Sequence, residues 1–205
     1  MTLKERIISV LPVHEECFTN IQGTTLFVRD MKPINGGHAT IDSLGGGVAA
    51  VELHNPSSLT VDFDAFPENA LPLGVGLYEK QCECVLFPEG ADELEWVLFI
   101  ETKYVNSLEN AQKKAYGYPQ LMVTQIKKTV DYFRAKNIIS QDKRVNAIVS
   151  YPTLEDGFES WCFPVTYEDG TTESVEDILT NNNILIRATN FANIKSVKRI
   201  YLGKR

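Results

Sequence analysis

The sequence predicts an α/β fold in which a mixed central sheet is flanked by helices, and three neighbouring segments carry that prediction. The strand expected over Trp96–Lys103 begins with five consecutive apolar residues, which is typical of a central strand buried on both faces. A long helical region follows over residues 108–136, and the β-branched run Val145–Ser150 predicts the next strand. Because a helix joins these two strands, we expect them to pair in parallel through a right-handed crossover.

The N-terminal part of the chain predicts one helix and several strands. Thr2 and Glu5 form a capping-box pattern, and the apolar stripe that follows ends at Pro12, so residues 2–11 are expected to be helical. Glycine-rich loops are expected at Gly36-Gly37 and at residues 45–47. The strands expected in this part are Thr24–Arg29, Val48–Leu53 and Leu59–Phe66.

The remaining elements complete the expectation of one domain over residues 1–205. Val75–Lys80 and Cys82–Phe87 are expected to form a strand meander with Trp96–Lys103, and Pro119 fits a kink or the first turn of a second helical segment. A turn is expected at residues 167–170, and terminal strands at 184–189 and 195–202. The domain then consists of a core at 75–151, an N-terminal helix and strands at 1–74, and a C-terminal extension at 152–205.

Composition narrows the class of protein. The hydrophobic fraction of 43% and the charged fraction of 23% are ordinary for a globular chain, so disorder is not expected. The apolar run at residues 7–11 is too short for a secretory signal, and no stretch approaches the ~20 apolar residues of a membrane span. We therefore expect a cytoplasmic protein without a membrane partner.

The four cysteines, Cys17, Cys82, Cys84 and Cys162, are expected to be thiols in a reducing compartment. A zinc site formed by three of them with His14 is conceivable, but the spacing matches no common zinc module. The favoured interpretation is that they are small hydrophobic side chains.

Charge is distributed unevenly along the chain. Residues 103–144 hold nine basic and three acidic residues, a net charge of +6 in a chain of net charge −7. This asymmetry favours a surface that faces a polyanion, whereas the alternative is that the lysines solvate the outside of a helix. Tyr116 and Tyr118 lie within this stretch and are expected either to stack on bases or to pack in the core. The candidates for contact with nucleic acid are Lys113, Lys114, Gln120 and Lys127.

An acid and a base two residues apart end the buried strand. Glu101 and Lys103 share one face of that strand, because side chains at i and i+2 point the same way. If the preceding strand pairs antiparallel with Phe87 opposite Val97, Glu83 lies directly opposite Glu101. Two facing carboxylates repel each other unless a divalent cation lies between them, and hard cations prefer oxygen ligands. The pattern therefore favours metal-assisted hydrolysis of phosphodiesters.

The order of an acid on one strand, Glu-x-Lys on the next, a long helix and then a parallel strand resembles the core of the PD-(D/E)xK, or restriction-endonuclease-like, nucleases. The resemblance covers residues 75–151, and the helix at 2–11 corresponds to the helix that opens the family core. It implies that Glu83 and Glu101 bind Mg²⁺ or Mn²⁺ and that Lys103 contacts phosphate or the attacking water. Glu83 replaces the usual aspartate, and no Pro-Asp dipeptide precedes it.

The resemblance also leaves alternatives for the site. Asp92 or Asp64 takes the place of the first acid if Glu83 points away. A further acid from the first helix and polar residues from the helix after the motif are expected in the family. The candidates for the acid are Glu5, Glu15 and Glu16, and those for the polar residues are Gln112, Gln120 and Gln125.

The function expected from these observations is metal-dependent hydrolysis of nucleic acid, DNA in preference to RNA, by a catalytic set of Glu83, Glu101 and Lys103. The alternative is a non-catalytic domain of the same fold that binds nucleic acid or a protein partner. Independently of this choice, a homodimer is considered for the protein. A third interpretation is an unrelated α/β domain, in which Val145–Ser150 does not lie parallel in the same sheet. In these last two cases Glu101 and Lys103 are an exposed ion pair of little energetic value.

Overall fold

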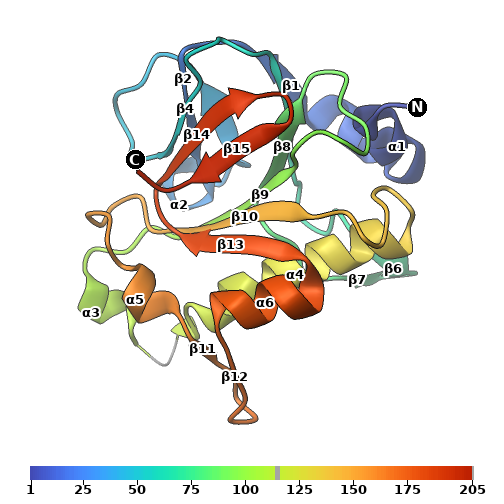
Figure 1. Cartoon of the computed structure of the whole chain (residues 1–205). Coiled ribbons are helices and arrows are strands. Elements are labelled where there is room, and N and C mark those ends of the chain that lie inside the picture. The colour runs from blue at the N-terminus through green and yellow to red at the C-terminus, as the bar shows by residue number, and fades with distance from the viewer. Residues whose placement is uncertain (114–115, 205) are drawn as a thin grey trace.

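A computed structural model describes residues 1–113 and 116–204 of the chain. The structure is a mixed α/β arrangement in three layers (Figure 1): a five-stranded sheet, a six-stranded sheet, and helices on the outer face of the six-stranded sheet. None of the helices in the described ranges is long and apolar enough to cross a membrane.

The six-stranded sheet carries the elements of the sequence pattern. Its order is β1-β5-β8-β9-β10-β13, antiparallel from β1 to β9 and parallel from β9 to β13. The strands are β1 (Phe18–Ile21), β5 (Val61–Ala65), β8 (Cys84–Pro88), β9 (Leu98–Thr102), β10 (Val145–Ser150) and β13 (Ile184–Ala188).

The second sheet packs on the first and combines the two ends of the chain. Its order is β15-β14-β4-β2-β3, in which β14 pairs in parallel with β4 and the other pairs are antiparallel. The strands are β2 (Thr25–Arg29), β3 (Thr40–Asp42), β4 (Val51–His54), β14 (Phe191–Ser196) and β15 (Arg199–Leu202).

Most of the helices pack on the other face of the six-stranded sheet, and the small hairpin at residues 165–173 projects below them (Figure 1). The helices are α1 (Leu3–Val10), the 3-10 helix η1 (Pro12–Cys17), α2 (Lys32–Asn35), α3 (Leu108–Ala111), α4 (Gln120–Ala135), α5 (Glu159–Cys162) and α6 (Val175–Asn182). Two hairpins pair β6 (Pro72–Gly74) with β7 (Leu77–Tyr78), and β11 (Val165–Thr166) with β12 (Thr172–Glu173).

Strand β9 separates two hydrophobic cores because its successive side chains point to opposite faces. Phe99 packs in the core beneath the helices, where its ring centroid lies 5.4 Å from that of Phe133 in α4. Ile100 packs in the core between the two sheets. Burial on both faces explains why the strand is continuously apolar.

The central expectations from the sequence are confirmed. Val145–Ser150 forms β10, which pairs in parallel with β9 after the crossover through α4. This strand order excludes the topology named for the third interpretation. The capping box of Thr2 and Glu5 begins α1, and Pro119 is the N-cap of α4 after a break in the helical region.

Several local expectations are wrong or incomplete. Val75–Lys80 does not extend the meander: residues 72–78 form the β6–β7 hairpin, whose residues are all exposed. The strand expected at 48–53 begins at Val51, and the sequence patterns did not indicate β1, β3, α2 or α6. These elements are short, so their pairing in the two sheets and their packing decide their structure more than local periodicity does.

The N-cap of α1 offers a first test of the fold. The Thr2 hydroxyl accepts from the Glu5 backbone N–H at 3.3 Å, and the Glu5 carboxylate accepts from the Thr2 N–H at 2.7 Å. Thr2→Ala is expected to lower the free energy of unfolding by about 1 kcal/mol, because one N-terminal amide loses its partner. Urea unfolding followed by circular dichroism measures this loss, and Thr2→Ser, which keeps the hydroxyl, should retain most of the stability.

Candidate functional site

Glu83 directly precedes β8, and the register of β8 and β9, continued by one residue, sets it opposite Glu101. Cys84 pairs with Ile100 and Val85 with Phe99, and the Glu83 N–H donates to the Ile100 carbonyl at 3.1 Å. This is the register expected from the sequence. Both glutamates lie on the same face of the sheet as Val85 and Phe99, toward the helices.

Lys103 bridges the two carboxylates. Its Nζ lies 2.8 Å from Oε1 of Glu83 and 2.6 Å from Oε1 of Glu101. The side chains of Glu83 and Lys103 are 18% and 22% exposed, whereas that of Glu101 is fully buried. The structure thus brings together the three residues predicted from the sequence, with Glu101 at the closed end and Glu83 and Lys103 toward solvent.

Glu101 has an unusual electrostatic environment. Its Oε1 lies 2.6 Å from the Lys103 ammonium, and its other carboxylate oxygen, Oε2, has no hydrogen-bond partner among the described residues. Burial raises its pKa to about 8, with Glu83 adding to the increase and Lys103 opposing it. Burial lowers the pKa of Lys103, but the two carboxylates outweigh that effect and raise it.

Asp30 is a further acid at the site that the sequence interpretation missed. It follows β2 directly, is 3% exposed, and accepts from the Lys32 N–H at 2.8 Å. Burial raises its pKa, and the negative charge of Glu83 raises it further. An acid immediately after a buried strand was the available signal, but only the packing of the two sheets brings it toward Glu83.

A chain of aromatic side chains begins at the end of β10, the strand next to β9. Tyr151 follows β10 directly, is fully buried, and its hydroxyl has no hydrogen-bond partner among the described residues. The ring centroid of Tyr118 lies 6.3 Å from that of Tyr151 and 5.7 Å from that of Tyr116, on which it stacks. Tyr118 packs against the core, and Tyr116 is 46% exposed. Burial raises the pKa of Tyr118 and that of Tyr151.

An open pocket of about 590 Å³ lies beside the site, between the β6–β7 hairpin, α4 and the segment after α2. We call it the hairpin groove. Glu83 is one of its lining residues, so the groove reaches the ion-pair network of Lys103. Gln125 also lines it and donates to the Gln81 carbonyl at 2.7 Å. The other residues that bear on its chemistry are Lys32, His38, Tyr78, Lys80 and Leu121.

The residues predicted to contact nucleic acid are not gathered into one basic surface. Lys127 forms an ion pair with Glu173 at 2.8 Å, and Lys113 is exposed just after α3. Gln120 is half-buried at the start of α4, and Lys114 lies outside the described residues. The described basic residues of this segment therefore do not form the continuous, unpaired surface that would be expected to face a polyanion.

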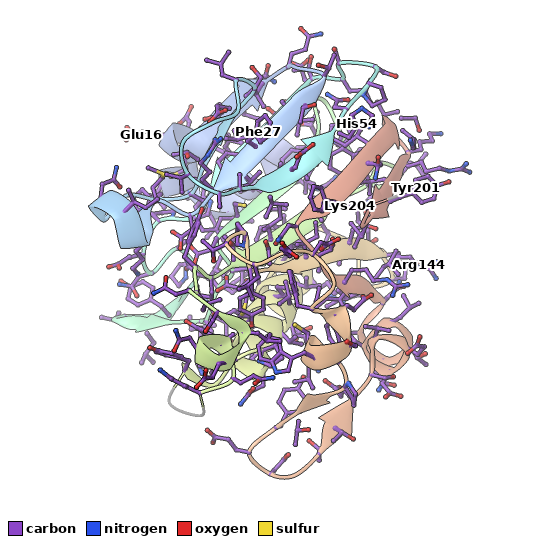
Figure 2. The ribbon with its side chains drawn as sticks, turned by 90° about the vertical axis from the view of Figure 1, so that its left-hand side faces the viewer. Glu16, Phe27, His54, Arg144, Tyr201 and Lys204 are labelled. Carbon is purple, nitrogen blue, oxygen red and sulfur yellow. The ribbon has the colours of Figure 1, made fainter. Side chains whose placement is uncertain are left out.

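Other basic residues of the 103–144 segment have structural roles. Buried Arg134 donates to the carbonyls of Asn182 and Lys143, and the Lys143 ammonium donates to the carbonyls of Glu93 and Glu95. Figure 2 shows Arg144 on the side of the molecule opposite the β6–β7 hairpin.

The alternative acids are engaged elsewhere. Glu5 closes the capping box of α1, and Glu15 and Glu16 are exposed on η1. Asp64 and His14 Nδ1 lie 2.8 Å apart in a fully buried pair, and no metal-binding group of His14 with the cysteines is found among residues 1–113 and 116–204. Asp92 accepts from the Leu94 N–H in the loop before β9, at the end of the strand opposite Glu101. Gln112 is exposed after α3.

The acidic side chains at the site suit a divalent cation that keeps several waters better than one whose ligands all come from the protein. Within residues 1–113 and 116–204, no group of three or more His, Cys, Asp or Glu side chains could hold a metal ion. Glu83 and Glu101 nevertheless offer two facing carboxylates, one of them buried with an oxygen that lacks a hydrogen-bond partner. Mg²⁺ is commonly held by one or two carboxylates, with waters and substrate phosphate completing its shell, so these residues fit such an ion.

No family model matches the sequence, and neither a curated protein nor a solved structure matches the chain. The fold and the site therefore define a mixed α/β protein with an acid–lysine centre at the end of a buried strand.

Proposed function

We propose that this protein is a divalent-metal-dependent phosphodiester hydrolase of the PD-(D/E)xK type, acting on DNA in preference to RNA. The observation that carries the proposal is the contact of one lysine with two facing carboxylates, at 2.8 and 2.6 Å, at the end of a buried strand. Isolated ion pairs are common on protein surfaces, but a fully buried glutamate that shares one lysine with a second glutamate has a large desolvation cost and is typical of a functional site.

The arrangement of elements supports the same proposal. Strands β8 and β9 present the acid and the Glu-x-Lys element, α4 crosses over the sheet, and β10 returns parallel to β9. Helix α1 precedes these elements and packs in the core beneath them. This is the order on which the resemblance to the nuclease family rests.

Each residue has a distinct role in this proposal. Glu83 and Glu101 hold Mg²⁺ or Mn²⁺, which when bound polarises the phosphate and lowers the pKa of a bound water. Lys103 would contact a non-bridging oxygen of the scissile phosphate or orient the attacking water. The hydrophobic core around Glu101 has a low dielectric constant, which strengthens these interactions.

A cleavage assay tests the proposal. Wild type and Lys103→Ala are titrated with Mg²⁺ or Mn²⁺ in the presence of single- and double-stranded DNA, and the products are resolved on a gel. We expect metal-dependent cleavage that falls by about 10²-fold or more in Lys103→Ala, because the positioned cation at the phosphate is lost.

Lys198→Ala is the matched control, because Lys198 is exposed in the turn between β14 and β15, in the other sheet. It should cleave like the wild type. Absence of cleavage by the wild type, together with no heat of metal binding in calorimetry, would instead favour a binding domain that has the fold without the chemistry.

A further inference from the structure

The hairpin groove has the size and position of a substrate-binding feature. Its volume of about 590 Å³ falls within the range of ordinary ligand pockets, and Glu83 places its inner end next to Lys103. The base of the hairpin is held by two hydrogen bonds, from the Tyr132 hydroxyl to the Pro72 carbonyl and from the Glu79 N–H to the Leu71 carbonyl. These hydrogen bonds fix the position of the hairpin, which forms one wall of the groove.

The charges around the groove disfavour a long duplex. Three glutamates line it, and each is paired with a lysine: Glu68 with Lys32, Glu79 with Lys128, and Glu83 with Lys103. Lys80 is exposed and forms no ion pair with another described residue. Since duplex binding depends on many phosphate contacts, this surface suits a ligand that needs only a few of them.

An exposed aromatic side chain of the groove suits an unpaired base. Tyr78 lines the groove and is 47% exposed, and outside the groove the same hairpin exposes Leu73, Val75 and Leu77 by 57%, 103% and 65%. In a duplex the faces of the bases are stacked on each other, whereas an unpaired strand offers them to aromatic and apolar side chains.

From these contacts we propose that the hairpin groove binds an unpaired nucleic-acid strand, with a base against Tyr78 and the backbone passing Lys80 toward Lys103. This inference rests on the proposed function and narrows its substrate to single strands, flaps or frayed ends. The duplex part of such a substrate needs few contacts with the protein.

Binding without turnover tests the inference separately from catalysis. A 5′-fluorescein 12-nucleotide DNA, as a single strand and as a duplex of the same sequence, is titrated with the full-length protein in EDTA and followed by fluorescence anisotropy. We expect the single strand to bind at least about 10-fold more tightly than the duplex. Tyr78→Ala should weaken it by roughly 5- to 150-fold, the range found for one stacked base.

The salt dependence supplies a second readout. Lys32 and Lys103 are each shared with a glutamate, so even with Lys80 the slope of log K against log[salt] should not be steeper than about −2, and Lys80→Ala should reduce its magnitude by about 0.7. Leu94→Ala is the control, because Leu94 is 71% exposed in the loop before β9 and does not line the groove. It should bind like the wild type.

The outcomes separate the two proposals. Binding that depends on Tyr78 without any metal-dependent cleavage keeps the groove and removes the hydrolase. Equal affinity for both DNA forms, or an unchanged affinity in Tyr78→Ala, overturns the groove. So does the absence of DNA binding in a protein that sediments as a dimer and becomes monomeric on Val75→Ser, because the hairpin is then a subunit interface.

Discussion

Wild-type protein in EDTA is expected to lose stability as the pH rises from about 5 to about 8.5, and Glu101→Gln is expected to lose much less. The pKa of Glu101 is about 8 in the folded chain and near 4.5 when the residue is exposed in the unfolded chain. In that window the folded state holds a proton that the unfolded state has released, so raising the pH favours unfolding. At about 1.4 kcal/mol for each pKa unit, the contribution is on the order of 4 kcal/mol.

The measurement is the difference between the two unfolding free energies, from urea unfolding at pH 5 and pH 8.5. Glu109→Gln, an exposed position on α3, serves as control and should follow the wild type. Mg²⁺ at pH 8.5 should restore stability to the wild type and not to Glu101→Gln, since a cation on the carboxylates replaces the proton. Parallel pH curves for wild type and Glu101→Gln would mean that Lys103 keeps Glu101 ionised throughout, contrary to the raised pKa.

Phe133→Ala is expected to lower the free energy of unfolding by about 3–5 kcal/mol, which corresponds to roughly 6–20 °C in Tm for a chain of this length. Phe133 is fully buried on α4, with its ring centroid 5.4 Å from that of Phe99 and 5.9 Å from that of Phe66. Truncation removes these contacts and leaves a cavity at the point where α4 rests on β9.

Calorimetry of the variant measures this effect directly. Leu121→Ala, also on α4 but 40% exposed, is the matched control and should change Tm by only a few degrees. Because β9 carries Glu101, a loss of cleavage in Phe133→Ala well below its Tm would show that the same packing also positions the site. A change in Tm no larger than that of Leu121→Ala would contradict the packing described here.

The sequence alone was sufficient for the part of the fold that strand periodicity and element order dictate. The apolar run before Glu101 predicted a buried central strand, and the alternation of side chains predicted its pairing with Glu83. The helical region between β9 and Val145–Ser150 predicted a parallel return, because parallel neighbours require a crossover. The site residues Glu83, Glu101 and Lys103 were found by this reasoning, although their role in catalysis stays a prediction.

Only the tertiary structure decided what lies around that centre. The charge of Glu83 acts on Asp30 because a second sheet packs on the first, and no local pattern encodes this proximity between segments more than fifty residues apart. The use of Arg134 and Lys143 as buried donors likewise depends on where distant carbonyls lie, so charge counting overestimated the free basic surface. The β6–β7 hairpin does not join the sheet, because β5 pairs directly with β8 and leaves no edge for it. Short-range periodicity therefore determined the central strands and their acids, whereas long-range packing determined the groove and the charges that a substrate would meet.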